Sequence, residues 1–158
     1  RARAGRARRL DGDGVRADRR VERTPEERGR ERVAAHRYGD LVAAVTEETT
    51  FASRPMFGCV ACYVHGRLKL VLADGRRPWN GILVPTARDH HGSLRRALPA
   101  LRVQPILGKW LHLTAGGDDF EDDVARLVAL VLADDDRVGV EPTPRRARPG
   151  ASRRSRRG

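Results

Sequence analysis

The stretch MFGCVACYVHG, residues 56–66, holds both cysteines of the chain in the spacing C-x-x-C, with a histidine three residues after the second. This spacing is found in zinc sites, where thiolates and imidazoles bind the metal, and in redox pairs, where a thiolate attacks a disulfide. A structural zinc needs further ligands, and a redox pair sits at a helix N-terminus that lowers the thiol pKa. The element that carries Cys59 and Cys62 therefore decides whether either chemistry is possible.

A β-strand is the element that this stretch predicts, because its residues are mainly β-branched, aromatic or small and apolar. Side chains alternate between the two faces of a strand, so residues three apart point to opposite sides. In a strand from Met56 to Val64, one face would carry Phe57, Cys59, Ala61 and Tyr63, and the other Gly58, Val60, Cys62 and Val64. The two thiols then cannot converge. We predict that both cysteines pack as small hydrophobic side chains and bind no metal.

The other candidates for metal binding or catalysis also lack a functional spacing. The histidines at 36, 65, 90, 91 and 112 include no paired motif that would complete a zinc site. The acidic run at 118–123 lacks the glycine turn of a calcium loop and suits the positive end of a helix dipole. The sequence has no phosphate-binding glycine loop and no G-x-S-x-G or H-E-x-x-H motif. We expect no catalytic residue, no cofactor and no enzymatic activity.

Trp79 and Trp110 are the two residues whose type most favours binding. Tryptophan is an ordinary core residue, but it is also enriched where proteins bind partners. Trp79 follows Arg76 and Arg77 closely, and Trp110 follows Lys109. We predict that these five residues form an interaction surface, with core packing of both tryptophans as the alternative.

Hydrophobic periodicity assigns these residues to helices and strands. A first helix is predicted to start at Thr24-Pro25-Glu26-Glu27, although Gly39 also permits a helix confined to about 30–48. A second is predicted to start with a capping-box-like pattern at 86–89, to bury Leu94, Ala97 and Leu98, and to stop at Pro99. Strands are predicted at 57–65, 67–74, 81–86, 102–107 and 109–114, and a last helix has the apolar stripe Phe120, Val124, Leu127, Val128 and Val131. This order indicates an α+β fold, an antiparallel sheet of about five strands packed with three helices.

Charge divides the chain into three parts. Residues 1–37 contain 13 Arg and 7 acidic residues, residues 38–141 contain 12 basic and 14 acidic residues, and residues 142–158 contain 7 Arg and no acid. The segments 1–23 and 142–158 have too little apolar surface to offset their ordering entropy. We predict disordered Arg-rich tails at 1–23 and 142–158 around one domain, 24–141. Two cysteines, no membrane-length apolar run and no secretory signal indicate a cytoplasmic protein that does not enter membranes.

One part of the sequence resembles a known family. The run Arg54-Pro55-Met56-Phe57-Gly58, then Tyr63 and a strand closing on Ala73-Asp74-Gly75, resembles the N-terminal domain of the TfoX/Sxy family. Members show an R-x-M-F-G-G opening, an aromatic residue shortly after, and a second strand that runs into an A-D-G-like turn; here Cys59 replaces the second glycine. The resemblance spans about residues 38–140. It implies an α+β fold and a non-enzymatic regulatory domain of competence co-regulators, here expected as a stand-alone relative without the helical C-terminal domain.

Three functional classes follow from these observations. The resemblance and the lack of catalytic motifs favour a regulatory or protein-interaction module that binds a protein partner. The Arg-rich tails favour, as an alternative, a nucleic-acid binder without sequence specificity. Of the 32 basic residues all but Lys69 and Lys109 are Arg, which suits phosphate binding and equally GC-rich codon usage. A small-ligand or enzyme domain built around Trp79 and Trp110 is the third class.

Overall fold

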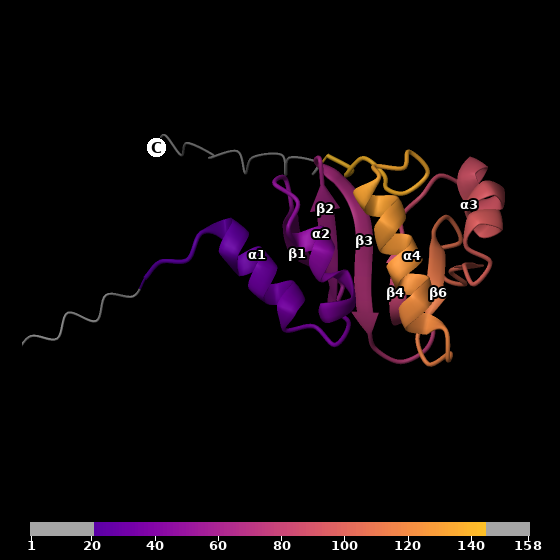
Figure 1. Ribbon diagram of the computed structural model, residues 1–158, viewed down its shortest axis with the longest axis horizontal. Helices are drawn as coiled ribbons and strands as arrows, with labels where there is room; N and C mark the ends of the chain where they lie inside the picture. Colours follow the sequence, from indigo (N-terminus) through magenta and orange to yellow (C-terminus); the bar gives the residue numbers. More distant parts are fainter. Residues whose placement is uncertain (1–20, 145–158) are drawn as a thin grey trace, which may run out of the picture.

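The computed structural model describes residues 21–144, which form one sheet with helices packed against it (Figure 1). The helical elements are α1 (Pro25–Ala34), η1 (Asp40–Val42), α2 (Ala43–Thr46), η2 (Arg88–His90), α3 (His91–Ala97) and α4 (Phe120–Leu132). The strands are β1 (Ala52–Met56), β2 (Cys59–Val64), β3 (Arg67–Asp74), β4 (Asn80–Val84), β5 (Arg102–Val103) and β6 (Leu111–Thr114). The predicted α+β fold is confirmed, with six strands and four α-helices.

All neighbouring strands of the sheet are antiparallel, in the order β1-β2-β3-β4-β6-β5. The predicted hairpin of β2 and β3 turns at His65 and Gly66, whose φ values are 52° and 72°. Positive φ at both turn residues is the type I′ geometry that matches the twist of a two-residue hairpin. In the strand order given above, β1 and β5 are the two edge strands of the sheet.

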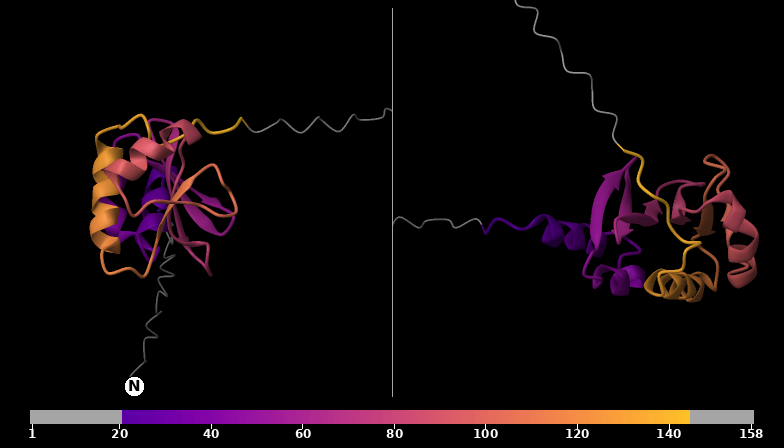
Figure 2. Two further views of the ribbon diagram at one scale, coloured as in Figure 1. Left: turned by 90° about the vertical axis from the view of Figure 1, so that its right-hand side faces the viewer. Right: turned by 90° about the horizontal axis from the view of Figure 1, so that it is seen from above.

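Helices α2 and α4 pack on one face of the sheet, and α1 and α3 lie beyond its two edges and add residues to the same core. Figure 1 shows α2 and α4 crossing in front of the strands, and the side view of Figure 2 shows α4 standing to one side of them. The predicted stripe of α4 is buried at every position: Phe120, Val124, Leu127, Val128 and Val131. It packs in one cluster with apolar residues of the strands and of α3, among them Leu70, Leu72, Ile82, Leu94, Leu98 and Leu111.

The first helix starts where the sequence predicts but ends early. Thr24 Oγ1 accepts a hydrogen bond from Glu27 N, and the Glu27 carboxylate accepts one from Thr24 N, which completes a capping box. The helix stops at Ala34, and a separate short helix follows at α2. The alternative prediction of a helix confined to 30–48 is wrong. The chain turns back so tightly that a Cβ at Gly39 would lie 2.0 Å from the Val33 carbonyl oxygen.

The predicted strand from Met56 to Val64 is in fact interrupted. Phe57 and Gly58 form a two-residue turn, with φ values of 49° and 77°, between β1 and β2. The sequence analysis missed β1, which contains Pro55. Proline has no N–H for a sheet ladder, but an edge strand tolerates it.

Two further predictions need correction near the sheet's other edge. The helix expected to be capped by Thr86 starts instead with η2 and has no side-chain cap, because Thr86 Oγ1 donates to the Arg137 carbonyl at 2.6 Å. Leu94 and Leu98 are buried as predicted, whereas Ala97 is exposed. The strand expected at 102–107 ends at Val103, where the chain bends into a loop.

The described residues bear only partly on the predicted tails, since residues 1–20 and 145–158 lie outside them. Before residue 144, the segment that follows α4 is held to the sheet, because Leu68 and Val140 exchange two backbone hydrogen bonds of 3.0 and 3.1 Å. Between residues 21 and 144, no helix combines the length and the apolar character needed to cross a membrane.

Candidate binding pocket on the open face of the sheet

The sheet face opposite the helices carries a second, smaller apolar cluster. Val71 and Leu83 are paired neighbours at its centre, on β3 and β4, and Ala61 lies beside them on β2. Because alternate residues of a strand share a face, Cys59 and Tyr63 belong to the same side as Ala61. No helix between residues 21 and 144 contributes to this cluster, so the strands leave an apolar surface here.

This surface is hollowed into a pocket of about 140 Å³. Four residues come from the strands and the others from loops that rise at its rim. The lining residues are Met56, Cys59, Val71 and Leu83 from the sheet, and Phe57, Trp79, Leu107, Lys109 and Trp110 from the loops. All but Lys109 are apolar, so the pocket suits an apolar group held close to a single cation.

Both tryptophans of the chain thus border one pocket, although they are 31 residues apart in sequence. The Nζ of Lys109 lies 5.5 Å from the centre of the Trp110 ring, a cation–π arrangement. The predicted interaction surface is therefore brought together for Trp79, Trp110 and Lys109. Arg76 and Arg77 are exposed in the loop after β3 and do not line the pocket.

Phe57 is the most unusual residue of the rim. Its side chain is 99% exposed, and its backbone has a left-handed φ of 49°. Bulky residues rarely adopt this conformation, which costs about 1–2 kcal/mol and which asparagine or glycine would adopt more easily. The turn therefore holds a large apolar side chain in water beside an apolar pocket, at a cost in folding free energy.

A buried glutamine shapes the loop on the opposite side of the pocket. Gln104 is fully buried, and its Oε1 accepts hydrogen bonds from Ile106 N at 2.7 Å and Leu107 N at 2.6 Å. Its Nε2 donates to the Pro78 carbonyl at 3.4 Å, which links this loop to the one that carries Trp79. Gln104 was not singled out from the sequence, because nothing local marks a glutamine as buried and the loop that it contacts at Pro78 lies 26 residues away.

The two cysteines point to opposite faces, as the alternation of the strand predicts. Cys59 lines the pocket, whereas Cys62 is buried in the core under the helices. Burial raises the pKa of the Cys62 thiol to about 12, and burial, with a smaller effect of Asp74, raises the pKa of Cys59. Among residues 21–144, no three His, Cys, Asp or Glu side chains are grouped so that they could hold a metal ion.

Some of the residues that carry the TfoX/Sxy resemblance lie at one end of the sheet. Met56 ends β1, Phe57 and Gly58 form the turn before β2, and Asp74 ends β3, where it pairs with Asn80. Asp74 Oδ1 lies 3.9 Å from His36 Nε2, a buried ring nitrogen without a hydrogen bond in the described part of the chain. Burial lowers the pKa of His36, and Asp74 opposes that effect. Further along the sheet, the Arg54 guanidinium lies 5.7 Å from the centre of the Tyr63 ring.

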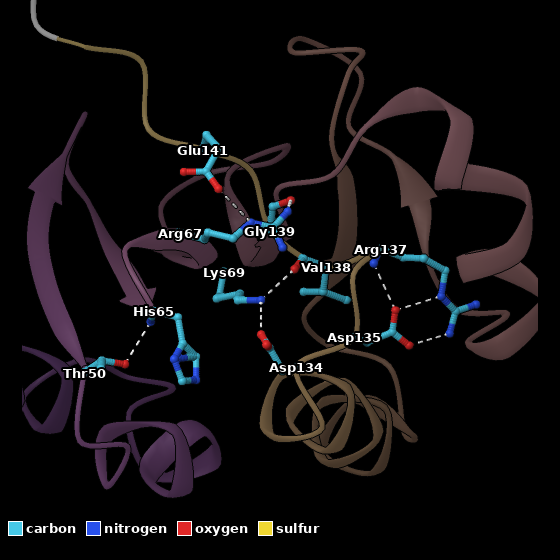
Figure 3. Close-up of polar contacts among 10 residues, drawn as sticks. All are labelled: Thr50, His65, Arg67, Lys69, Asp134, Asp135, Arg137, Val138, Gly139 and Glu141. Atoms are coloured by element: carbon cyan, nitrogen blue, oxygen red, sulfur yellow. Dashed lines mark hydrogen bonds and ion pairs between the residues drawn. The ribbon is translucent and has the colours of Figure 1, made fainter.

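A second polar residue missed by the sequence analysis is Lys69, shown in Figure 3. Its side chain is completely buried next to the bulge between β2 and β3, and Nζ donates to Asp134 Oδ1 and to the Val138 carbonyl. Gly139 covers the aliphatic stem. Lys69 therefore fixes the segment that returns from α4 to the sheet.

The pocket is thus an apolar site with one cation at its rim and no catalytic grouping among its lining residues. Comparisons of the chain with family models, with curated proteins and with solved structures found no match.

Proposed function

We propose that this domain is a non-enzymatic regulatory module that binds a protein partner through the pocket between Trp79 and Trp110. One apolar side chain of the partner would enter the pocket, while Phe57 would pack on the partner's surface. The resemblance to TfoX/Sxy N-terminal domains supports a regulatory role. The strongest support is Phe57 itself, since an exposed aromatic in a left-handed turn destabilises the free domain and is explained if binding covers it.

The size of the pocket supports a side chain rather than a larger cofactor. A volume of about 140 Å³ is well below the roughly 300–1,000 Å³ of ordinary small-molecule sites. A single aromatic or branched aliphatic side chain is of suitable size. Lys109 at the rim would favour a partner with an acidic residue near that anchor.

The test is a selection of peptides from a random displayed library on the full chain. We expect the selected peptides to share one aromatic or aliphatic anchor, and to change the fluorescence of the two tryptophans on binding. Phe57→Asn should weaken binding about tenfold or more, because it removes the exposed ring without disturbing the turn. The matched control is Ile106→Ser, which removes another exposed apolar side chain that does not line the pocket.

Alkylation of Cys59 gives an independent test, because it fills the pocket without a substitution. Selected peptides should no longer bind the alkylated chain. If the Phe57→Asn chain and the alkylated chain both bound the selected peptides as tightly as the unmodified wild type, the pocket would not be the site.

A further inference from the structure

Charge is strongly segregated within the folded domain, although residues 38–141 carry a small net charge. Residues 75–117 contain seven basic residues and one acid, Asp89. Residues 118–141 contain nine acids and two arginines, Arg126 and Arg137. The basic stretch includes β4, α3, β5 and β6, whereas the acidic stretch includes α4 and the loop after it. The near-neutral total therefore conceals one basic and one acidic region.

Four arginines of the basic stretch lie along one edge of the sheet. Arg95, Arg96 and Arg102 line an open hollow of about 570 Å³ whose floor includes Gly92 and Pro99. Arg102 also lines an adjoining hollow of about 240 Å³ together with Arg77. We call Arg77, Arg95, Arg96 and Arg102 the basic edge. Figure 1 shows α3 beyond β6 at this end of the domain, and Figure 2 shows the same end facing the viewer.

The guanidinium groups of the basic edge are available to a ligand. All four side chains are exposed, and none forms an ion pair with another residue in the range 21–144. Arg102 Nη1 donates to the carbonyls of Pro99 and Leu101, which orients its guanidinium beside the hollow. No acidic residue lines either hollow of the basic edge. Arg102 also borders a third hollow with Asp118, Asp119 and Asp123, so the acidic residues of 118–141 begin next to the basic edge.

We propose that the basic edge binds the phosphate backbone of a nucleic acid. Arginine forms paired hydrogen bonds to phosphate, and phosphate contacts supply affinity without reading base sequence. A long polyanion fits better than an acidic peptide, because the chain's positive charge is divided among three regions. Residues 1–37 and 142–158 carry net charges of +6 and +7 in the sequence, and the basic edge adds a third region in the fold. This site is separate from the pocket and does not depend on the function proposed for it.

The test uses the full chain, so that the terminal arginines are present in every sample. Binding of a labelled random 20-base-pair duplex is measured from 0.05 to 0.3 M salt for three proteins. These are the wild type, the edge variant Arg95→Gln/Arg96→Gln, and the control Arg54→Gln/Arg126→Gln, which removes two exposed arginines outside the three positive regions. Each neutralised phosphate contributes about 0.9 to the slope of log affinity against log salt.

We expect the edge variant to lower the magnitude of that slope by about 1.8 and to bind about tenfold or more weakly at 0.1 M salt. The control should keep the wild-type slope, and Arg95→Lys/Arg96→Lys should keep most of it. Equal slopes for the edge variant and the control would assign any binding to other regions and overturn the proposal. The proposal would also be overturned if the wild type did not bind the duplex. It would equally be overturned if the wild type bound poly-glutamate of equal length as tightly as the duplex, because that result would indicate an acidic protein partner.

Discussion

Lys69 Nζ lies 3.0 Å from Asp134 Oδ1, yet the lysine side chain is wholly buried while the aspartate side chain is 60% exposed. The same ammonium donates to the Val138 carbonyl at 3.1 Å. A buried lysine ammonium needs such partners, because desolvation of an unpaired charge is costly. One residue of β3 thus holds both ends of the turn that follows α4, and the turn closes over the lysine's stem at Gly139.

Substitution of Lys69 should separate the contribution of its charge from that of its stem. Lys69→Met retains the stem but leaves the Val138 carbonyl without its donor, which should cost about 1–3 kcal/mol of unfolding free energy. Lys69→Ala also opens a cavity and should cost more than Lys69→Met. Urea denaturation of the three proteins measures both values. Equal stability of Lys69→Ala and the wild type would contradict the buried position of this side chain.

The partner carboxylate predicts a pH dependence of stability. The hydrogen bond and charge of Lys69 lower the pKa of Asp134 below its ordinary value of 3.8. A lowered pKa in the folded state means that the stabilisation is present above pH 3.8 and is lost as the pH falls through the folded value. Asp134→Asn, which also tolerates the positive φ of 53° at this position, should be less stable than the wild type at pH 7. The difference should shrink as denaturation is repeated towards pH 2.

The strain at Phe57 predicts a stabilising substitution. Phe57→Asn places a residue that accepts left-handed φ before Gly58, and should raise the free energy of unfolding by about 1 kcal/mol. Thermal and urea denaturation measure the gain. The turn at His65 and Gly66 is the matched control: histidine tolerates this conformation better than phenylalanine, so His65→Asn should gain less. A loss of stability in Phe57→Asn would mean that the exposed ring makes a contact that the structure does not contain.

Gln104 predicts a coupling between a buried amide and the pocket loop. Gln104→Leu leaves the N–H groups of Ile106 and Leu107 without acceptors and should cost about 2 kcal/mol. The loop that carries Leu107 and Lys109 should loosen, so hydrogen exchange at residues 105–109 should become faster. Ile106→Ser changes the same loop without removing an acceptor and should alter neither measurement appreciably.

The two thiols should differ in reactivity. At pH 8 a pKa of about 12 leaves only about one Cys62 in ten thousand as thiolate, and the core shields it as well. Cys59 lies at the half-buried wall of the pocket and should be alkylated first, more slowly than an ordinary thiol because its pKa is raised. Mass spectrometry after a timed alkylation gives the order. Labelling of Cys62 in the folded chain at the rate of the unfolded chain would contradict the assignment.

Local pattern predicts much of this fold, because alternation and helical periodicity depend on neighbours in sequence. The separation of Cys59 from Cys62, the hairpin at His65-Gly66 and the buried stripe of α4 all follow from such patterns. The turn at Phe57 was missed because phenylalanine gives no signal for left-handed φ. The strand β1 was missed because Pro55 is usually a strand breaker, and only its edge position makes it acceptable.

The candidate site was less predictable because its parts come from distant segments. Trp79 and Trp110 stand out by residue type, but they precede opposite ends of the antiparallel pair β4 and β6, so the strand order alone does not predict that both border one pocket. Arg76 and Arg77 are adjacent to Trp79 in sequence and nevertheless lie outside the pocket. Lys69 and Gln104 were not singled out from the sequence. The partners of Lys69 lie 65 and 69 residues away. Gln104 contacts Pro78, 26 residues away, as well as the nearby N–H groups of Ile106 and Leu107.

The pairing of Leu68 with Val140 has a consequence for biosynthesis. A ribosome completes β1, β2 and β3 well before it reaches residue 140, so the main-chain groups of Leu68 first emerge without their partner. An unpaired strand edge readily pairs with another chain. Lys69 at that time also lacks Asp134 and Val138. The final turn of the domain thus covers main-chain groups of β3, and we expect chains that end before Asp134 to aggregate more readily than the full chain.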